Sequence, residues 1–215
     1  MIIGLGLVAT ATAFDVQTTD SGVLLSWLDL PATWVYAPEG APPEVVAEPA
    51  LNAAFDTWSL VDGSRAQFVE GTATPTAASQ ADAANTVWWD TSGETVGDTL
   101  AFTSTWSDDN GILVAFDIAL NPAFSWAAGD YDLQSTVSHE IGHALGLGHS
   151  AEVDAVMFPT LTDGTTVREL ALDDEEAVRF LYPDVLFDPL ACNTATGAPI
   201  PLSVLILLAI RRRSR

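Results

Sequence analysis

HEIGHALGLGH, residues 139–149, contains all three histidines of this 215-residue chain. Residues four apart lie on one face of a helix, so His139 and His143 can direct their imidazoles at one point, with Glu140 beside them. A continuing helix would carry His149 too far along its axis, but Gly146 can adopt a positive φ and end the helix. The stretch therefore predicts a helix, a sharp turn and a third histidine that returns to the first two.

Three convergent imidazoles indicate a zinc site. Catalytic zinc is typically held by three protein ligands in tetrahedral geometry, with the fourth position left to water. The expected ligands are His139, His143 and His149, and Glu140 is the expected general base. A bare HExxH pattern also arises by chance on helices whose histidines only pack, which is the alternative interpretation. The extended pattern with Gly146 and His149 favours zinc.

The same stretch resembles the active-site motif of the metzincin peptidases, and within them it is most similar to the matrixins. The resemblance continues through Ser150, the Met-turn sequence AVMFP at 155–159 and LDDEEAVRFLY at 172–182, and extends more weakly upstream to about Trp34. It implies a bacterial, matrixin-like zinc endopeptidase that acts on proteins or peptides. Met157 would then pack beneath the metal without binding it, and Phe158 stands where some metzincins have a ligating tyrosine.

The remainder of the chain predicts an α+β fold whose N-terminal part is of α/β type. Val45, Val46, Leu51, Ala54, Phe55 and Trp58 have the spacing of an amphipathic helix. A second helix is expected from about 133 to 145, capped by Asp132. Strands are expected at 33–36, 66–70, 86–90, 99–106 and 111–120. With the resemblance, this becomes a metzincin fold: a twisted mixed sheet of about five strands, two long helices, an active-site cleft and a small C-terminal subdomain that ends in a helix.

The resemblance also assigns parts of the cleft. An edge strand within 99–106 is expected to pair with the substrate backbone, and the loop 159–166, with Leu161, is expected to line the pocket for the residue after the cleaved bond. The helix beginning at Asp173 is expected to bury Ala177, Val178, Phe180 and Leu181. DDNG at 108–111 is interpreted as a hairpin turn, with a calcium site as the alternative.

Composition excludes several function classes. Seven arginines and no lysine stand against 29 acidic residues, which gives a formal net charge of −22. Such a chain repels nucleic acid and anionic lipid, so no nucleic-acid partner is expected. The single cysteine, Cys192, excludes an internal disulfide. Because no further histidine is available for a second zinc, any structural ion is expected to be calcium held by oxygen ligands.

Four segments are expected along the chain. Residues 1–13 are apolar and end in Ala11-Thr12-Ala13, which indicates a signal peptide, although no basic residue precedes the run and a hydrophobic strand is the alternative. Residues 14–183 form the matrixin-like catalytic domain, and 184–197 are a linker that contains Cys192. Residues 198–215 combine an apolar stretch with arginines, resembling a myxobacterial-type C-terminal sorting signal, with a short membrane anchor as the alternative.

These features predict a secreted or cell-surface monomer that touches a membrane only through its C-terminal tail. No cysteine precedes the active-site helix, so the cysteine latch of latent matrixins is not expected. Two other functions remain open: a surface binding module that keeps the metzincin fold without turnover, and a metal-dependent hydrolase of non-peptide substrates.

Overall fold

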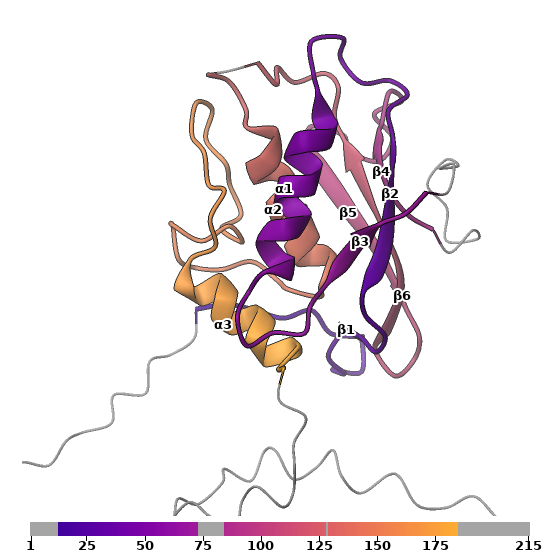
Figure 1. The fold of residues 1–215 in the computed structure, drawn as a ribbon, viewed down its shortest axis with the longest axis vertical. Helices are drawn as coiled ribbons and strands as arrows, with labels where there is room; N and C mark the ends of the chain where they lie inside the picture. The colour runs from indigo at the N-terminus through magenta and orange to yellow at the C-terminus, as the bar shows by residue number, and fades with distance from the viewer. Residues whose placement is uncertain (1–12, 73–83, 128, 185–215) are drawn as a thin grey trace, which may run out of the picture. The chain divides into compact units, whose positions relative to one another are not determined.

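The computed structural model describes residues 13–72, 84–127 and 129–184. One mixed sheet is covered on one face by two helices that lie side by side, and a third helix lies at their lower end in Figure 1. The elements are β1 (Ser26–Trp27), β2 (Ala32–Ala37), α1 (Ala47–Ser59), β3 (Phe68–Glu70), β4 (Asn85–Trp89), β5 (Ala101–Ser107), β6 (Ile112–Leu120), α2 (Leu133–Ala144) and α3 (Leu172–Leu181). The α+β fold expected from the sequence is confirmed, with six strands instead of about five.

Several predictions fall outside the described residues. They concern residues 1–12 of the signal peptide expected at 1–13, Cys192 with nearly all of its linker, and the C-terminal tail. Within the described part of the chain, no helix has the length and apolar character needed to cross a bilayer.

The sheet runs β1-β6-β4-β2-β3 with parallel neighbours, and β5 pairs antiparallel with β6. The turn between β5 and β6 is built by Asp108, whose Oδ1 accepts the backbone N–H groups of Asn110 and Ile112, each at 2.9 Å. This local pairing explains the DDNG sequence as a hairpin turn. Since β5 pairs with β6 alone among the described strands, its outer edge is open.

The core forms where α1 meets the sheet and α2. Phe55 of α1 stacks on Trp34 of β2 with ring centroids 4.0 Å apart, and the buried Trp58 donates its indole N–H to Ser138 O of α2 at 2.8 Å. This bond satisfies a polar atom that burial would otherwise leave costly. Val46 was expected on the buried side of α1, but it lies just before the helix and is 77% exposed.

Two predictions at the ends of the domain need correction. The first strand is expected at 33–36, yet the two-residue strand β1 precedes it. Phe180 was expected in the core but is 56% exposed, because the buried face of α3 follows Asp174, Ala177 and Val178 at helical spacing. Beyond that helix, the buried Tyr182 donates its hydroxyl to Leu145 O at 2.6 Å and thereby fastens α3 to the end of α2.

Asp90 organises the loop between β4 and β5, which leads into the cleft described below. Its Oδ1 accepts the backbone N–H groups of Ser92 and Gly93 and the Ser92 hydroxyl, and its Oδ2 accepts the N–H groups of Thr95 and Val96. Burial alone raises the pKa of a carboxyl group, but these hydrogen bonds outweigh it and lower the pKa of Asp90 to about 2.

We expect Asp90→Asn to destabilise the fold by about 1.5–3 kcal/mol at pH 7, because a charged acceptor of several hydrogen bonds is lost. A folded-state pKa below the ordinary 3.8 means that this contribution is fully present above about pH 4 and is lost as the pH falls through about 2. Urea unfolding at pH 7 and at pH 2 measures it, with Asp109→Asn on the exposed hairpin turn as the control. A difference that persists unchanged at pH 2 would contradict the charge-based explanation.

Candidate active site

The helix α2 begins and ends through specific backbone contacts. Its N-cap residue Asp132 accepts the backbone N–H of Ser135 at 2.9 Å through Oδ1. At the other end, Gly146 has a φ of +90°, and the backbone N–H groups of Gly146 and Leu147 return to His143 O and Gly142 O. This is the Schellman arrangement, in which a left-handed residue closes the last turn. The chain therefore reverses immediately after the helix.

The reversal brings the three histidines together. The ring centroids of His139 and His143 are 4.8 Å apart. The ring centroid of His149 lies 5.3 Å from that of His139 and 5.0 Å from that of His143. One ligand nitrogen from each ring lies within 4.8 Å of the others. In residues 13–72, 84–127 and 129–184 this is the one group of three or more histidine, cysteine or acidic side chains arranged to hold a metal. The expected structural calcium thus stays untested.

Backbone carbonyls orient two of these rings. Val156 O lies 2.7 Å from Nδ1 of His139, and Leu147 O lies 2.9 Å from Nδ1 of His143. Because a carbonyl only accepts, each Nδ1 carries the proton and each Nε2 is left with a free lone pair. Burial lowers the pKa of His139 to about 4 and also lowers that of His143. Both rings are therefore neutral at pH 7, which is the form that binds metals.

Glu140 lies beside the histidines and is buried. The hydroxyl of Thr103, on the edge strand β5, donates to Glu140 Oε2 at 2.6 Å. Burial raises the pKa of Glu140, while the neighbouring His143 and the Thr103 hydrogen bond act in the opposite direction. A carboxylate with a raised pKa, held in one orientation, is suited to take up a proton near neutral pH.

Met157 packs against the inner side of α2 and is 2% exposed. A Cβ added to Gly142 would lie 2.1 Å from the Met157 sulfur, so the helix can approach this side chain only because residue 142 is glycine. Asp174 of α3 accepts the backbone N–H groups of Val156 and Met157 at 2.8 and 3.0 Å. The turn beneath the histidines is thereby tied to α3.

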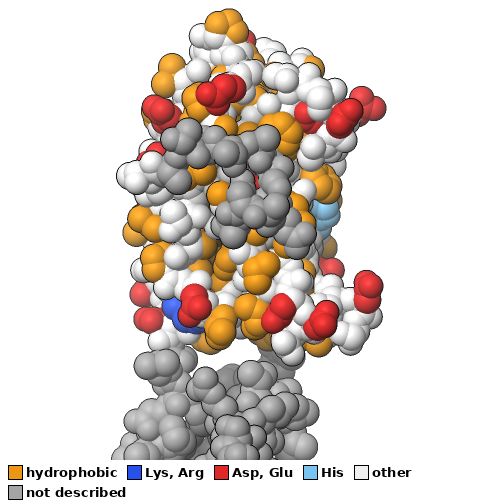
Figure 2. All heavy atoms as spheres, turned by 90° about the vertical axis from the view of Figure 1, so that its right-hand side faces the viewer, with side chains coloured by type: hydrophobic (Ala, Val, Ile, Leu, Met, Phe, Trp, Pro, Cys, Tyr) orange, Lys and Arg blue, Asp and Glu red, His pale blue; other side chains and the backbone are white. Residues whose placement is uncertain are grey.

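The histidines open into a cleft of about 660 Å³. One wall is β5, the floor is α2, and the opposite wall is the segment after Met157, including the expected Leu161. Asp98, Leu100, Ala101, Phe102 and Thr103 line the wall around the edge strand. In Figure 2, histidine side chains reach the surface at one edge of the outer sheet face, consistent with the exposure of His149. The cleft is therefore accessible from solvent.

Two residues of this cleft are not predictable from the sequence. Thr103 contacts Glu140, 37 positions away, and Gln17 donates its side-chain amide to Leu147 O at 3.0 Å while its Nε2 lies 3.4 Å from Nδ1 of His143. The segment around Gln17 pairs with the turn after α2, since Gln17 N donates to Gly146 O and Gly148 N to Asp15 O. Neither residue belongs to a recognisable motif, because both reach the site only through tertiary contacts.

Comparisons with known proteins agree with this geometry. A family model described as Matrixin matches residues 35–183. Among curated proteins, the chain is similar to metalloendoproteinase 5-MMP of Arabidopsis thaliana, with 55% identity over 51 residues, which are 24% of this chain and 14% of that protein. It is also similar to metalloendoproteinase 4-MMP of Arabidopsis thaliana, with 41% identity over 87 residues, 36% of this chain and 24% of that protein.

The similarity extends to an animal protein. Stromelysin-1 of Rattus norvegicus is 36% identical over 73 residues, which are 30% of this chain and 15% of that protein. The chain thus matches less than a quarter of the length of each of these relatives. The family model, in contrast, covers well over half of the chain. The chain therefore belongs to the matrixin family of metzincin zinc metallopeptidases.

Proposed function

We propose that the protein is a zinc-dependent endopeptidase in which His139, His143 and His149 hold the metal and Glu140 is the general base. The observation that carries the proposal is the convergence of the three imidazoles beside a buried carboxylate at the floor of an open cleft. Membership of the matrixin family supports the reaction class.

The donor set fits zinc. Zinc in proteins is commonly held by imidazole nitrogens, and each of the three rings offers one nitrogen within 4.8 Å of the other two. When bound, zinc would lower the pKa of a water molecule in its open coordination position and polarise a carbonyl oxygen. Two of the ligands need no deprotonation at neutral pH, because burial already keeps His139 and His143 uncharged.

The residues of this chain would divide the remaining work. Glu140 would accept the proton of the attacking water and deliver it to the leaving amine. Thr103 would hold Oε2 of that carboxylate in place. The free edge of β5 offers backbone N–H and C=O groups to an extended peptide, which would add to the sheet as a further strand. A peptide is the substrate that uses both features.

The two alternative functions predict different behaviour in one assay. A binding module would leave casein intact with or without zinc, and a hydrolase of non-peptide substrates would cleave small esters or amides only. Proteolysis of casein that a zinc chelator stops, and that added zinc restores, distinguishes the endopeptidase from both. No contact in the described residues specifically favours either alternative.

We also propose that the protein is exported, as a secreted or surface-tethered enzyme. The support is the apolar N-terminal run that ends in Ala11-Thr12-Ala13 and the apolar, arginine-terminated C-terminal segment. N-terminal sequencing of the protein recovered outside the producing cell is expected to begin at Phe14. Retention of residues 1–13 in that protein would contradict a cleaved signal.

We expect Glu140→Gln to retain zinc and to lower the rate of peptide cleavage by at least about 100-fold, because the proton acceptor is lost. His149→Ala is expected to lose both zinc and activity, since one ligand is removed. Metal analysis and a fluorogenic peptide assay on the same preparations test both variants. Substantial activity in Glu140→Gln would show that another group is the base, and full zinc content in His149→Ala would exclude that histidine as a ligand.

Thr103→Val is expected to lower kcat about 10-fold without loss of zinc, because Glu140 loses the hydrogen bond that orients it. Thr105→Val is a matched control: it lies on the same strand and the same side but does not line the cleft. Steady-state kinetics and metal analysis of both variants test this prediction. Equal rates in the two variants would remove Thr103 from the positioning of the base.

A further inference from the structure

We infer that the side-chain amide of Gln17 positions the zinc ligand His143, because it fixes the direction of the Leu147 carbonyl that holds this imidazole. The inference rests on the proposed function, since it concerns the same metal site. Gln17 precedes His143 by 126 positions in the chain and acts on it through Leu147. Gln17 is therefore a positioning residue and not a ligand.

Two side chains donate to one carbonyl oxygen. Nδ1 of His143 lies 2.9 Å from Leu147 O, and Nε2 of Gln17 lies 3.0 Å from the same atom. The two nitrogens are 3.4 Å apart. A carbonyl oxygen has two lone pairs and only accepts, so it can satisfy both donors, and the Gln17 amide must present its nitrogen here. The direction of this carbonyl is thus shared between a side chain of α2 and one of the N-terminal segment.

The backbone around this carbonyl does not fix its own direction. Leu147 stands between Gly146 and Gly148, and glycine has more conformational freedom to lose on folding than any other residue. The buried side chain of Leu147 anchors the residue itself. Its carbonyl, however, belongs to the peptide group that it shares with Gly148. Contacts from outside the turn are needed to hold this peptide group in one orientation.

The segment 15–17 supplies these contacts. Gln17 N donates to Gly146 O at 2.7 Å, and Gly148 N donates to Asp15 O at 2.9 Å. Between these two backbone contacts, the Gln17 side chain donates to the Leu147 carbonyl. The approach is close, because a Cβ added to Gly148 would lie 2.9 Å from Asp15 Cβ. One short segment therefore contacts three consecutive residues of the turn.

Gln17 acts on one of the three ligands in particular. A ligand imidazole that donates its second N–H to a fixed acceptor is held in one tautomer and one ring orientation. His143 uses Leu147 O for this purpose, whereas His139 uses a different carbonyl, Val156 O. Loss of the Gln17 amide would leave the Leu147 peptide group free to turn and would loosen the His143 ring. The His139 ring provides an internal reference within the same molecule.

The first test compares the same substitution at two glutamines. Gln17→Met keeps the length of the side chain and removes the amide. We expect the zinc affinity of the full-length protein to fall about 10-fold, because an outer hydrogen-bond partner of a metal ligand is lost. Gln67→Met is the control, since Gln67 is exposed and does not line the cleft, and its zinc affinity is expected to equal that of the wild type. Competition with a chromophoric zinc chelator measures all three proteins.

The second test separates positioning from a general loss of structure. In the zinc-free protein, we expect solvent exchange of the His143 Nδ1–H to accelerate about 5-fold in Gln17→Met, because its acceptor is no longer held. Exchange of the His139 Nδ1–H, which donates to Val156 O, is expected to stay unchanged. Nitrogen-15 NMR of the imidazole groups resolves the two rings. An equal change in both rings, no change at His143, or an unchanged zinc affinity in folded Gln17→Met would overturn the inference.

A third measurement needs no variant and decides the matter if Gln17→Met does not fold. When zinc is added to the wild-type protein, the side-chain amide proton resonances of Gln17 are expected to shift and those of Gln67 to stay in place. A Gln17 amide that does not respond to zinc would overturn the inference. Failure of the proposed function is seen separately, as zinc-loaded wild-type protein that leaves casein intact, because none of these three measurements depends on proteolysis.

Discussion

A helix that carries His139 and His143 can share a metal with His149 only if the chain reverses directly after its last turn. Without the reversal, His149 would lie about 9 Å further along the helix axis than His143. Gly146 makes the turn possible for two reasons. Its φ is +90°, and a Cβ at this position would lie 2.5 Å from Leu25 O. The convergence of the three histidines therefore depends on residue 146 having no side chain.

The reversal also supplies the groups that orient the ligands. Leu147 O, in the turn, accepts hydrogen bonds from the His143 ring and from the Gln17 side chain. Val156 O, in the segment that follows His149, accepts a hydrogen bond from the His139 ring. Asp174 of α3 holds Val156 and Met157 by their backbone N–H groups. A continuous set of polar contacts thus runs from α3 through the turn to the imidazoles. Since these atoms are shielded from water, each contact would be costly to leave unmade.

Local periodicity explains which features were predictable. The spacing of His139, Glu140 and His143 follows from helix geometry, and strands such as β2 and β6 follow from branched and aromatic runs. The two-residue strand β1 is too short to leave such a signal, and it pairs with the distant β6, where Ser26 lies opposite Ile112. Phe180 is apolar but lies out of helical phase with the buried Asp174, Ala177 and Val178, so apolar character alone does not predict its exposure.

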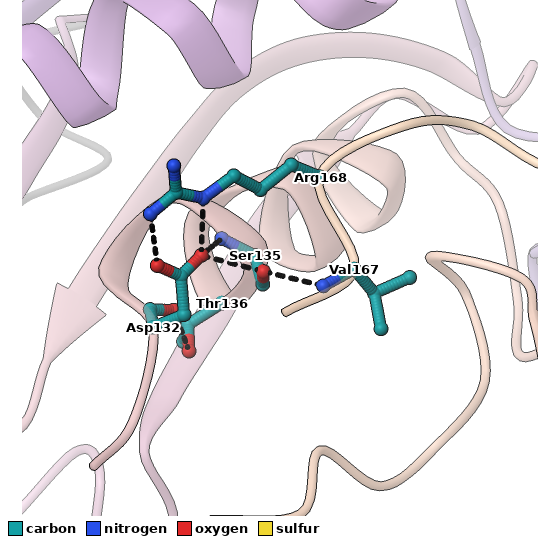
Figure 3. Close-up of polar contacts among 5 residues, drawn as sticks. All are labelled: Asp132, Ser135, Thr136, Val167 and Arg168. Carbon is teal, nitrogen blue, oxygen red and sulfur yellow. Dashed lines mark hydrogen bonds and ion pairs between the residues drawn. The ribbon is translucent and has the colours of Figure 1, made fainter. Parts of the chain in front are cut away.

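Contacts between segments that are distant along the chain could not be predicted from the sequence. Gln17 meets His143 across 126 positions, Thr103 meets Glu140 across 37, and Arg168 meets Asp132 across 36. Each is a common polar residue with no motif around it. Arg168 lies opposite Asp132, the N-cap of α2 (Figure 3), and only the tertiary structure shows that these two residues are neighbours.

The helix α2 links the chemistry of the site to the shape of the cleft. Ser135, whose hydroxyl oxygen accepts the backbone N–H of Val167, lies one helical turn before His139, so the loop attachment and the metal-binding face belong to the same helix. Their energetics nevertheless differ. The carbonyl oxygens that orient the histidines belong to the buried Leu147 and Val156, whereas in the ion pair the Arg168 side chain is 52% exposed and that of Asp132 13%, so the pair contributes little to stability. Loss of the contacts that orient the histidines would therefore cost the fold more than loss of the ion pair at the start of the same helix.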